Sequence, residues 1–214
     1  MFEEVLPKKT RESLAILGKS GLLEDAYLAG GTALALQLGH RVSADLDFFT
    51  QKKFQERNFA EKMKSINAEF KLEKLDRQTI LGYIGRTRFS LFFYDYKLLT
   101  KPKKFFGINV ADIKDIAPMK LLAISDRETK RDFIDLYFIV AVEKLFTLEE
   151  IFVLYDIKFK ALRQNQFHIL KSLTYFGAVE KSPMPKMLKE VNWRGVKRFF
   201  EMEAKKVADH LTAR

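Results

Sequence analysis

The spacing of the hydrophobic residues changes near residue 112, and this change limits the folds that the chain can adopt. Before that point, short apolar segments rich in β-branched and aromatic residues alternate with glycines and polar turns, as in strands. After it, apolar residues recur at helical spacing. We therefore predict an α+β fold in two parts: a mixed sheet with flanking helices over residues 1–111, and a helical region over residues 112–214 that packs on it.

The individual segments follow this division. In the first part we expect a helix over 10–18 ending at Gly18 and Gly21, a strand in 22–30, a helix in 31–39, a strand in 43–50, a helix over 54–66, and strands in 69–76, 79–88 and 88–99. In the second part we expect helices in 110–127, 127–146, 147–159 and 193–211. The third of these begins with a capping box formed by Thr147 and Glu150.

The composition is that of a folded globular protein. The chain has 214 residues, of which 47% are hydrophobic and 31% charged. It contains no cysteine, which excludes disulfides and thiolate zinc sites. No apolar run approaches the roughly 20 residues of a membrane-spanning helix, and the first residues, MFEEVLPKKTRESL, do not resemble a signal peptide. We expect a cytoplasmic protein without a membrane partner.

Positive charge is in excess and unevenly distributed. The formal net charge is +10 and the pI is about 9.6. Residues 97–111 contain four lysines and no acid, and residues 181–214 contain nine Lys or Arg against four Asp or Glu. Such segments attract polyanions, above all nucleic acid, although solvated lysine faces are also common. The basic segments 97–104 and 186–206 are therefore candidates for binding a nucleic acid such as RNA.

Two aspartates follow a probable helix in the segment AGGTALALQLGHRVSADLDFF, residues 29–49. Asp45 and Asp47 alternate with Leu46 and Phe48, so on a strand both carboxylates point to one face while the apolar residues point to the core. Two neighbouring carboxylates repel each other unless a cation lies between them. The pair therefore predicts a Mg²⁺ site of the kind used in phosphoryl chemistry.

A phosphate-binding turn is expected just before these aspartates. Gly30 and Gly31 let the backbone approach a phosphate closely, and the following helix offers free N–H groups and a partial positive charge. The Thr32 and Ser43 hydroxyls and the Arg41 guanidinium are the side chains in this segment that suit triphosphate oxygens. We predict that these five residues bind the nucleotide.

A third carboxylate is expected from a neighbouring strand. Asp95 follows the apolar stretch RFSLFFY and is flanked by Tyr94 and Tyr96. We predict that Asp95 lies near the aspartate pair, where it would act as the base for an acceptor hydroxyl or as a ligand of a second metal ion.

Each feature alone is also compatible with an ordinary turn or a solvated strand end. Together they form the pattern G-G-x(13)-D-x-D, followed by a later strand with an aspartate. This combination resembles the signature of the nucleotidyltransferase superfamily. More narrowly, the chain resembles the AbiEii/AbiGii toxin family of nucleotidyltransferases over most of residues 28–200, through the segments GGTALALQLGHRVSADLDFF, PMKLLAISDRETKRDFIDLYFI and SLTYFGAVEKSPMPKML.

The resemblance implies a nucleotidyltransferase-like sheet and an enzyme that uses Mg²⁺ or Mn²⁺ to transfer a nucleotide from an NTP to an acceptor hydroxyl. In characterised relatives the acceptor is the 3′ end of tRNA and the enzyme is the toxin of a toxin–antitoxin pair, so a cognate antitoxin is a further expected partner. The family also has an essential lysine and a downstream aspartate. Lys120 matches the lysine, and Asp132 or Asp135 matches the aspartate, with Asp135 preferred.

The residues themselves allow two interpretations of this second motif. Lys120 lies in an apolar helical segment, where a charge must be paired, and Arg127 follows on the same face. Asp132 and Asp135 share a face of the next helix and suit pairing with these cations. One interpretation is a structural salt-bridge cluster between two helices. In the other, Lys120 neutralises charge on the triphosphate while an aspartate orients it. The resemblance favours this second interpretation, with Lys120 and Asp135 as catalytic residues.

Two other functions remain open at this point. The acceptor of the nucleotide can be a small molecule or a protein side chain, because the fold allows these equally well. A relative without activity that binds RNA or a partner protein is the second alternative, and the presence of the motif carboxylates and of Lys120 argues against it. A zinc site is not expected, because the three histidines are scattered, and His40 is expected to be exposed at a helix end.

Overall fold

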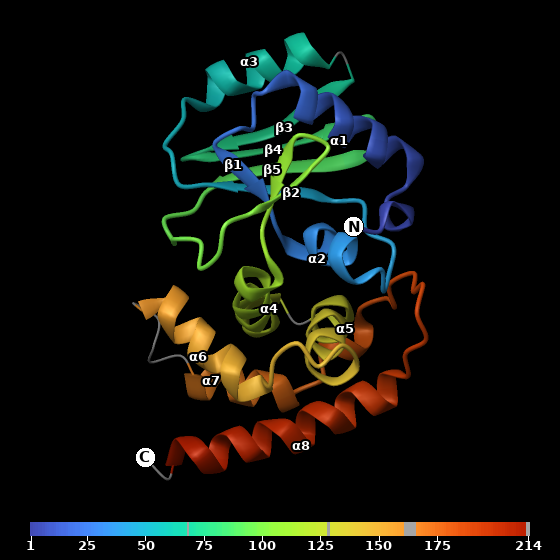
Figure 1. Ribbon diagram of the computed structural model, residues 1–214, viewed down its shortest axis with the longest axis vertical. Helices are drawn as coiled ribbons and strands as arrows, with labels where there is room; N and C mark the ends of the chain where they lie inside the picture. The colour runs from blue at the N-terminus through green and yellow to red at the C-terminus, as the bar shows by residue number, and fades with distance from the viewer. Residues whose placement is uncertain (68, 128, 161–165, 213–214) are drawn as a thin grey trace. The chain divides into compact units, whose positions relative to one another are not determined.

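The computed structural model describes residues 1–67, 69–127, 129–160 and 166–212, with side chains described up to residue 209. It divides the chain into two compact units, Met1–Asp112 and Ile113–Arg214 (Figure 1). The boundary between the units lies after Asp112, one residue later than the boundary predicted from the hydrophobic pattern. The packing of the helical part on the sheet stays a prediction.

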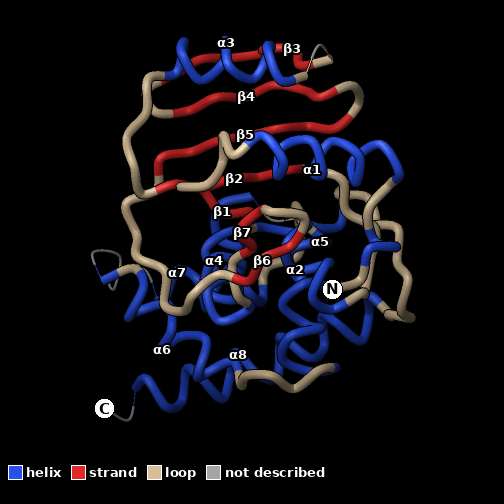
Figure 2. The backbone as a smooth tube through the Cα atoms, turned by 45° about the horizontal axis from the view of Figure 1, so that its top comes forward, coloured by secondary structure: helices blue, strands red, loops and turns tan. Residues whose placement is uncertain are grey.

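Within the described residues, the first unit is built around a seven-stranded sheet with the order β3-β4-β5-β2-β1-β7-β6 (Figure 2). The strands are β1 (Ala26–Leu28), β2 (Leu46–Thr50), β3 (Phe70–Asp76), β4 (Thr79–Ile84), β5 (Thr87–Phe93), β6 (Lys103–Phe105) and β7 (Ile108–Val110). β2 runs parallel to β5, and β1 runs parallel to β7, while the other neighbours are antiparallel. The predicted α+β fold with a mixed sheet is confirmed.

The two faces of the sheet differ in chemistry. Side chains alternate along each strand, so Phe48 on β2 and Phe89 on β5 point to one face, which we call the core face. Both rings are fully buried, and their centroids lie 5.7 Å apart. Asp47 on β2 and its register partner Ser90 on β5 point to the opposite face, which we call the site face. The predicted site carboxylate thus lies on the face opposite to Phe48 and Phe89.

In the described part of this unit, three α-helices flank the sheet: α1 (Lys8–Ser20), α2 (Gly30–Leu38) and α3 (Glu56–Ile66). α1 contacts β5, and the Thr10 hydroxyl of α1 lies 3.1 Å from that of Thr87, which points to the core face. α3 contacts β3 and β4. Figures 1 and 2 show α1 and α3 on the same side of the sheet and α2 on the other side. The core face is therefore covered by α1 and α3.

One predicted helix end is wrong. α1 continues through Gly18 to Ser20, and Gly21 is the residue that ends it, with a left-handed φ of 68°. Gly18 has a different role, because a Cβ at this position would overlap the carbonyl oxygen of Phe106 in the turn between β6 and β7. Its lack of a side chain lets α1 pack directly on that turn.

The end of the sheet also differs from the prediction. β5 ends at Phe93 rather than continuing to residue 99, and the basic segment 97–111 contains β6 and β7, which were not predicted. Lysines have low strand propensity and hide the strand pattern of this short hairpin. Its strands are only three residues long.

The second unit consists of helices and loops in its described residues. The helices are α4 (Ile113–Arg127), α5 (Lys130–Tyr137), the π-helix Phe138–Val142, α6 (Leu148–Lys158), α7 (Gln166–Thr174), the 3-10 helix Val179–Lys181 and α8 (Trp193–Thr212). The predicted capping box of α6 is confirmed, since Thr147 Oγ1 accepts a hydrogen bond from the Glu150 amide and Glu150 Oε2 accepts one from the Thr147 amide. The helix predicted over 127–146 is α5 followed by the π-helix.

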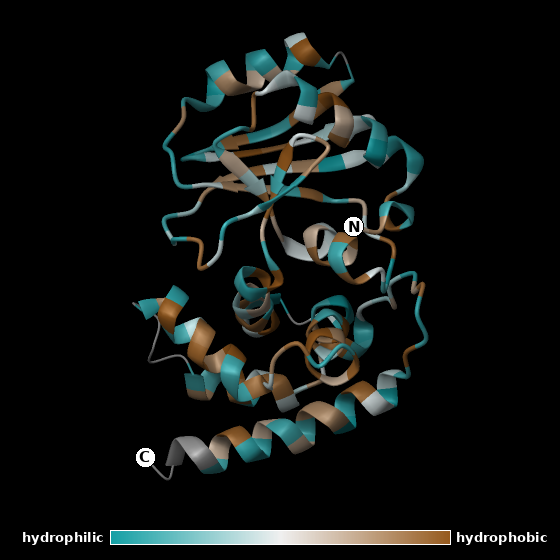
Figure 3. Cartoon of the chain, in the orientation of Figure 1, coloured by the Kyte–Doolittle hydropathy of each residue, from teal (hydrophilic) through white to brown (hydrophobic). Residues whose placement is uncertain are grey.

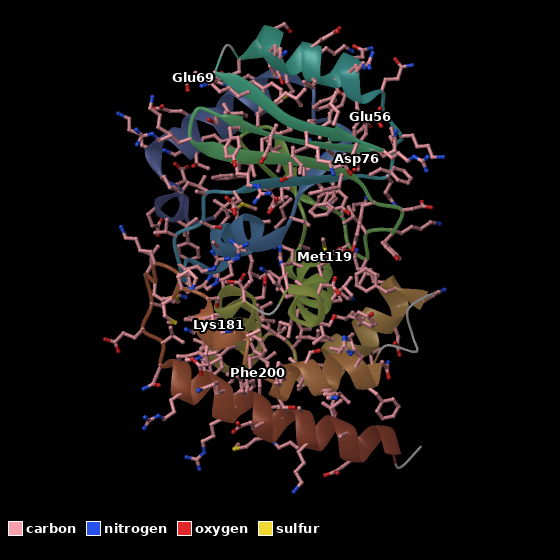
Figure 4. The ribbon with its side chains drawn as sticks, turned by 180° about the vertical axis from the view of Figure 1, so that it is seen from behind. Glu56, Glu69, Asp76, Met119, Lys181 and Phe200 are labelled. Carbon is pink, nitrogen blue, oxygen red and sulfur yellow. The ribbon has the colours of Figure 1, made fainter. Side chains whose placement is uncertain are left out.

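Aromatic residues form part of the interior of this unit. α8 is amphipathic, with brown and teal residues on different sides in Figure 3. Its Phe200, labelled in Figure 4, is fully buried and meets the Phe133 ring edge-to-face at 5.3 Å. Trp193 and Phe199 also contact rings of α5, so these residues serve packing. None of the helices in the described ranges combines the length and apolarity that crossing a membrane requires.

Candidate active site

Asp45 and Asp47 lie at the start of β2. Asp47 is the second residue of the strand, and Asp45 directly precedes it. Leu46 and Phe48 are fully buried, whereas the two aspartates are half-buried. The predicted separation of apolar and acidic side chains is confirmed. It follows from the alternation of side chains along a strand with one buried face.

Asp47 lies beside the glycine turn. The Ala29 amide donates a hydrogen bond to the Asp47 carbonyl oxygen at 3.0 Å, which holds the end of β1 against the start of β2. Gly30 has a φ of 67°, and a Cβ built on it would lie 3.3 Å from Asp47 Oδ2. Glycine suits this position for two reasons: the left-handed backbone and the closeness of the carboxylate.

The other predicted nucleotide-binding residues gather at the same helix start. A Cβ on Gly31 would overlap the Arg41 guanidinium, so glycine lets this buried side chain lie against the first turn of α2. The Thr32 hydroxyl lies 2.8 Å from the Ser43 hydroxyl and also donates to the Asp45 carbonyl oxygen. The structure therefore brings the glycine pair, Thr32, Arg41, Ser43 and the two aspartates together.

Ser90 is a site residue that the sequence did not reveal. Its hydroxyl donates a hydrogen bond to Asp47 Oδ1 at 2.9 Å, and its side chain is buried. This bond fixes the orientation of one carboxylate oxygen, while Oδ2 faces Gly30. The only sequence signal was a serine in the otherwise apolar segment FSLFF.

Asp95 follows β5 and is not the residue beside Asp47 in the sheet, so its predicted role at the pair stays a prediction. In the parallel register of β2 with β5, Asp47 faces Ser90 and Thr50 faces Phe93. Asp95 follows the end of β5 and is exposed. Asp95 is five positions after Ser90 in the sequence, and β5 ends two residues before it. The polar group next to Asp47 on β5 is a hydroxyl rather than a carboxylate.

The donor set at this place fits a hard divalent cation. Asp45 and Asp47 offer carboxylate oxygens, the ligands that Mg²⁺ and Mn²⁺ prefer. Within the described residues, no group of three or more His, Asp or Glu side chains forms a metal site by itself. Two carboxylates suffice when substrate phosphates and water supply the remaining ligands, as is usual for Mg²⁺.

Lys120 of the second motif is buried between two carboxylates. Its Nζ lies 2.8 Å from Asp132 Oδ1 and 2.5 Å from Asp135 Oδ2, and the residue is 2% exposed. Arg127 and Thr129 also donate hydrogen bonds to Asp132. The cluster links α4 to α5 and is balanced in charge, with two cations and two carboxylates.

The pKa of Asp132 reflects these contacts. Burial alone raises the pKa of this carboxyl, but the charges of Lys120 and Arg127 and the hydrogen bonds from Lys120 and Thr129 outweigh burial. The pKa of Asp132 therefore lies below its ordinary value, and the group is ionised at neutral pH. The structure shows the salt-bridge geometry of the first interpretation of this motif.

Two buried polar features of the chain were not predicted. His40 was expected at the surface but is fully buried after the end of α2. Lys158 of α6 forms a second buried ion pair with Asp115 of α4, with Nζ 2.7 Å from Oδ1. No spacing rule connects these two residues, which are 43 positions apart.

Comparisons of the sequence and of the fold with known proteins identify relatives of this chain. The chain matches the family model "Nucleotidyl transferase AbiEii toxin, Type IV TA system" over residues 13–210. It is 36% identical to protein aq_aa25 of Aquifex aeolicus (strain VF5) over 216 residues, which covers 96% of this chain and 98% of that protein. The crystal structure of JHP933 from Helicobacter pylori has a similar fold, with a TM-score of 0.54 and 19% identity over 97% of each chain.

The family match includes the glycine turn, the aspartate pair and the Lys120 cluster. The predicted resemblance is confirmed, and with it the prediction of an NTP-dependent nucleotidyltransferase. The chain belongs to the nucleotidyl transferase AbiEii toxin family.

Proposed function

We propose that this protein transfers a nucleotide from an NTP to the 3′-hydroxyl of an RNA, with tRNA as the expected acceptor, and that it acts as the toxin of a toxin–antitoxin pair. The observation that carries the proposal is the contact between the start of α2 and β2, where Asp47 Oδ2 faces Gly30. A glycine turn, a helix N-terminus and carboxylates at one place suit a metal-bound triphosphate.

The residues around α2 would bind the phosphates. Gly30 and Gly31 let the triphosphate approach the first N–H groups of the helix, which have no partner within it. Arg41 lies against Gly31 and would supply a guanidinium charge to the phosphate oxygens. The Thr32 and Ser43 hydroxyls, already 2.8 Å apart, would complete this side of the site.

Asp45 and Asp47 would hold Mg²⁺ or Mn²⁺, which supplies charge neutralisation on the phosphates when bound. Ser90 keeps Asp47 in a fixed orientation through its hydrogen bond to Oδ1. In the reaction, the acceptor oxygen forms a bond to the α-phosphorus while the bond to the pyrophosphate oxygen breaks in line with it. The hydroxyl proton leaves to water, and pyrophosphate is released.

In the proposed enzyme, Lys120 stabilises the packing of α4 with α5. Its Nζ contacts both Asp132 and Asp135, so reaching a phosphate would require it to give up at least one buried partner. Leaving a buried carboxylate unpaired is costly. We therefore assign Lys120, Asp132 and Asp135 to the stability of the α4–α5 pair.

The test is nucleotide transfer by purified protein. Wild-type protein is incubated with each labelled NTP, Mg²⁺ and total RNA, beside Asp47→Ala and a control, Glu61→Gln, whose exposed carboxyl lies on α3. We expect labelled RNA with the wild type and with Glu61→Gln, and none with Asp47→Ala. Equal labelling by Asp47→Ala would show that the aspartate pair is not the active site.

Cell growth tests the toxin assignment separately. Induced wild-type protein should arrest bacterial growth, whereas induced Asp47→Ala at the same protein level should not. Arrest by both proteins would mean that toxicity does not depend on transfer, even if transfer itself is observed in the first assay.

A further inference from the structure

The site face of the sheet continues beyond Asp47 as an exposed basic and aromatic surface. Arg88 on β5 pairs in register with Tyr83 on β4, and Tyr83 pairs with Lys71 on β3. Paired residues of antiparallel strands point to the same face. Arg88 lies two residues before Ser90, whose hydroxyl contacts Asp47, so all three side chains share the face of Asp47. We call Arg88, Tyr83 and Lys71 the Tyr83 row.

The residues of this row are accessible. Arg88 and Lys71 are exposed, and Tyr83 is 37% exposed, unlike Ile80 and Ile84 on the core face of the same strand. Lys74 pairs in register with Leu81 on the same face, but its Nζ lies 2.8 Å from Asp76 Oδ2, so the cations of this surface without such a carboxylate beside them on the strand are Arg88 and Lys71. A tyrosine between two cations on neighbouring strands offers a ring for stacking and charges for phosphates on both sides.

The position of the row relative to the glycine turn determines which substrate it can contact. The turn follows β1, on one side of β2, whereas the row lies on β5, β4 and β3, on the other side. If the triphosphate occupies the turn, the departing pyrophosphate lies on the β1 side of Asp47. In-line displacement then requires the acceptor to approach from the opposite side, which is the side of the row.

We propose that the Tyr83 row binds the single-stranded end of the RNA acceptor, with a base stacked on Tyr83 and backbone phosphates on Arg88 and Lys71. Sheet faces bind single strands in this way, because aromatic rings stack with bases while cations follow the backbone. The inference rests on the proposed transfer to RNA and adds the surface that holds the acceptor. A protein partner is less well matched, because the row has charges on both sides of its one ring and no aliphatic centre.

The first experiment measures binding of a short, labelled single-stranded RNA with a free 3′-hydroxyl. Tyr83→Ala should weaken binding about tenfold, as expected for the loss of one stacked base, whereas Tyr83→Phe should bind like the wild type. The double variant Lys71→Glu/Arg88→Glu should weaken binding far more than its control, Lys62→Glu/Lys64→Glu. The control makes the same change in net charge on exposed lysines of α3, which covers the core face.

Steady-state transfer assays distinguish this inference from the proposed function. Tyr83→Ala should raise the KM for RNA while leaving the KM for the NTP unchanged, and Asp47→Asn should still bind the RNA. If the row variants and the α3 control lose RNA affinity equally, or if none of them does, the inference is wrong although transfer to RNA can still be correct. If the wild type labels a protein or a small molecule and no RNA, the proposed acceptor fails as well.

Discussion

Gly30 combines an unusual backbone conformation with a functional contact, and a second glycine allows the two to be separated. Gly21 has nearly the same φ, 68° against 67°, but a Cβ built on it meets nothing within 4 Å. At Gly30 a Cβ would lie 3.3 Å from Asp47 Oδ2. Alanine would therefore cause backbone strain at both Gly21 and Gly30. Only at Gly30 would its Cβ also lie beside the Asp47 carboxylate.

We expect Gly30→Ala and Gly21→Ala each to lower the free energy of unfolding by roughly 1–2 kcal/mol, since both place a Cβ in the left-handed region. Only Gly30→Ala should also reduce nucleotide transfer, because its methyl group fills space beside the carboxylate. Denaturant unfolding and the transfer assay check these outcomes. Equal activity of the two variants would argue against phosphate binding at this turn.

The Lys120 cluster predicts a pH effect on stability. The pKa of Asp132 is lower in the folded protein than in the unfolded chain, so its contribution is present above the unfolded value and is lost as the pH falls through the folded value. The difference in unfolding free energy between wild type and Asp132→Asn should therefore shrink as the pH falls below about 4. A difference that is constant between neutral and acidic pH would contradict this assignment.

Removing the lysine itself tests whether its role is structural. Lys120→Ala leaves two buried carboxylates without their shared cation, and we expect a loss of about 3–5 kcal/mol in unfolding free energy. Unfolding measured by circular dichroism checks the prediction. A variant with wild-type stability and abolished transfer would instead support direct contact of Lys120 with the nucleotide.

Among the strands, the register between β2 and β5 decides which groups lie near the site. Ser90 faces Asp47, while Asp95 lies beyond the strand end. We expect Ser90→Ala to reduce transfer about tenfold, because a hydrogen bond to a charged carboxylate is lost, and Asp95→Asn to retain wild-type rates. The opposite result would support Asp95 as the third catalytic acid and remove Ser90 from the site.

The same register explains what the sequence could and could not predict. The glycine turn and the aspartate pair are separated by few residues, so local patterns predicted their helix, strand and shared position. The pairing of Asp47 with Ser90 joins residues 43 positions apart, and no local pattern specifies such a contact. β6 and β7 were missed because they are short and one of them is lysine-rich, and the buried Lys158–Asp115 pair was missed because its members lie on helices distant in sequence.

For the entire chain, the net charge of +10 predicts how RNA binding responds to salt. If Arg88 and Lys71 of the Tyr83 row each neutralise one phosphate, these two contacts alone should contribute a slope of about −1.4 in a plot of log affinity against log salt concentration. Lys71→Glu/Arg88→Glu should flatten this slope, and the α3 control should change it less. Binding that does not vary with salt would contradict contact with a polyanion.

The outermost strand β3 has a consequence for the behaviour of the protein in solution. Unpaired strand edges attract other chains, and proteins commonly protect them with bulges and charges. β3 has a register irregularity between Leu72 and Lys74, and Lys71, Glu73 and Lys74 are exposed along it. Replacing these lysines by alanine would remove charges that keep other strands from pairing with the edge of β3. Such variants are therefore expected to form oligomers through this edge.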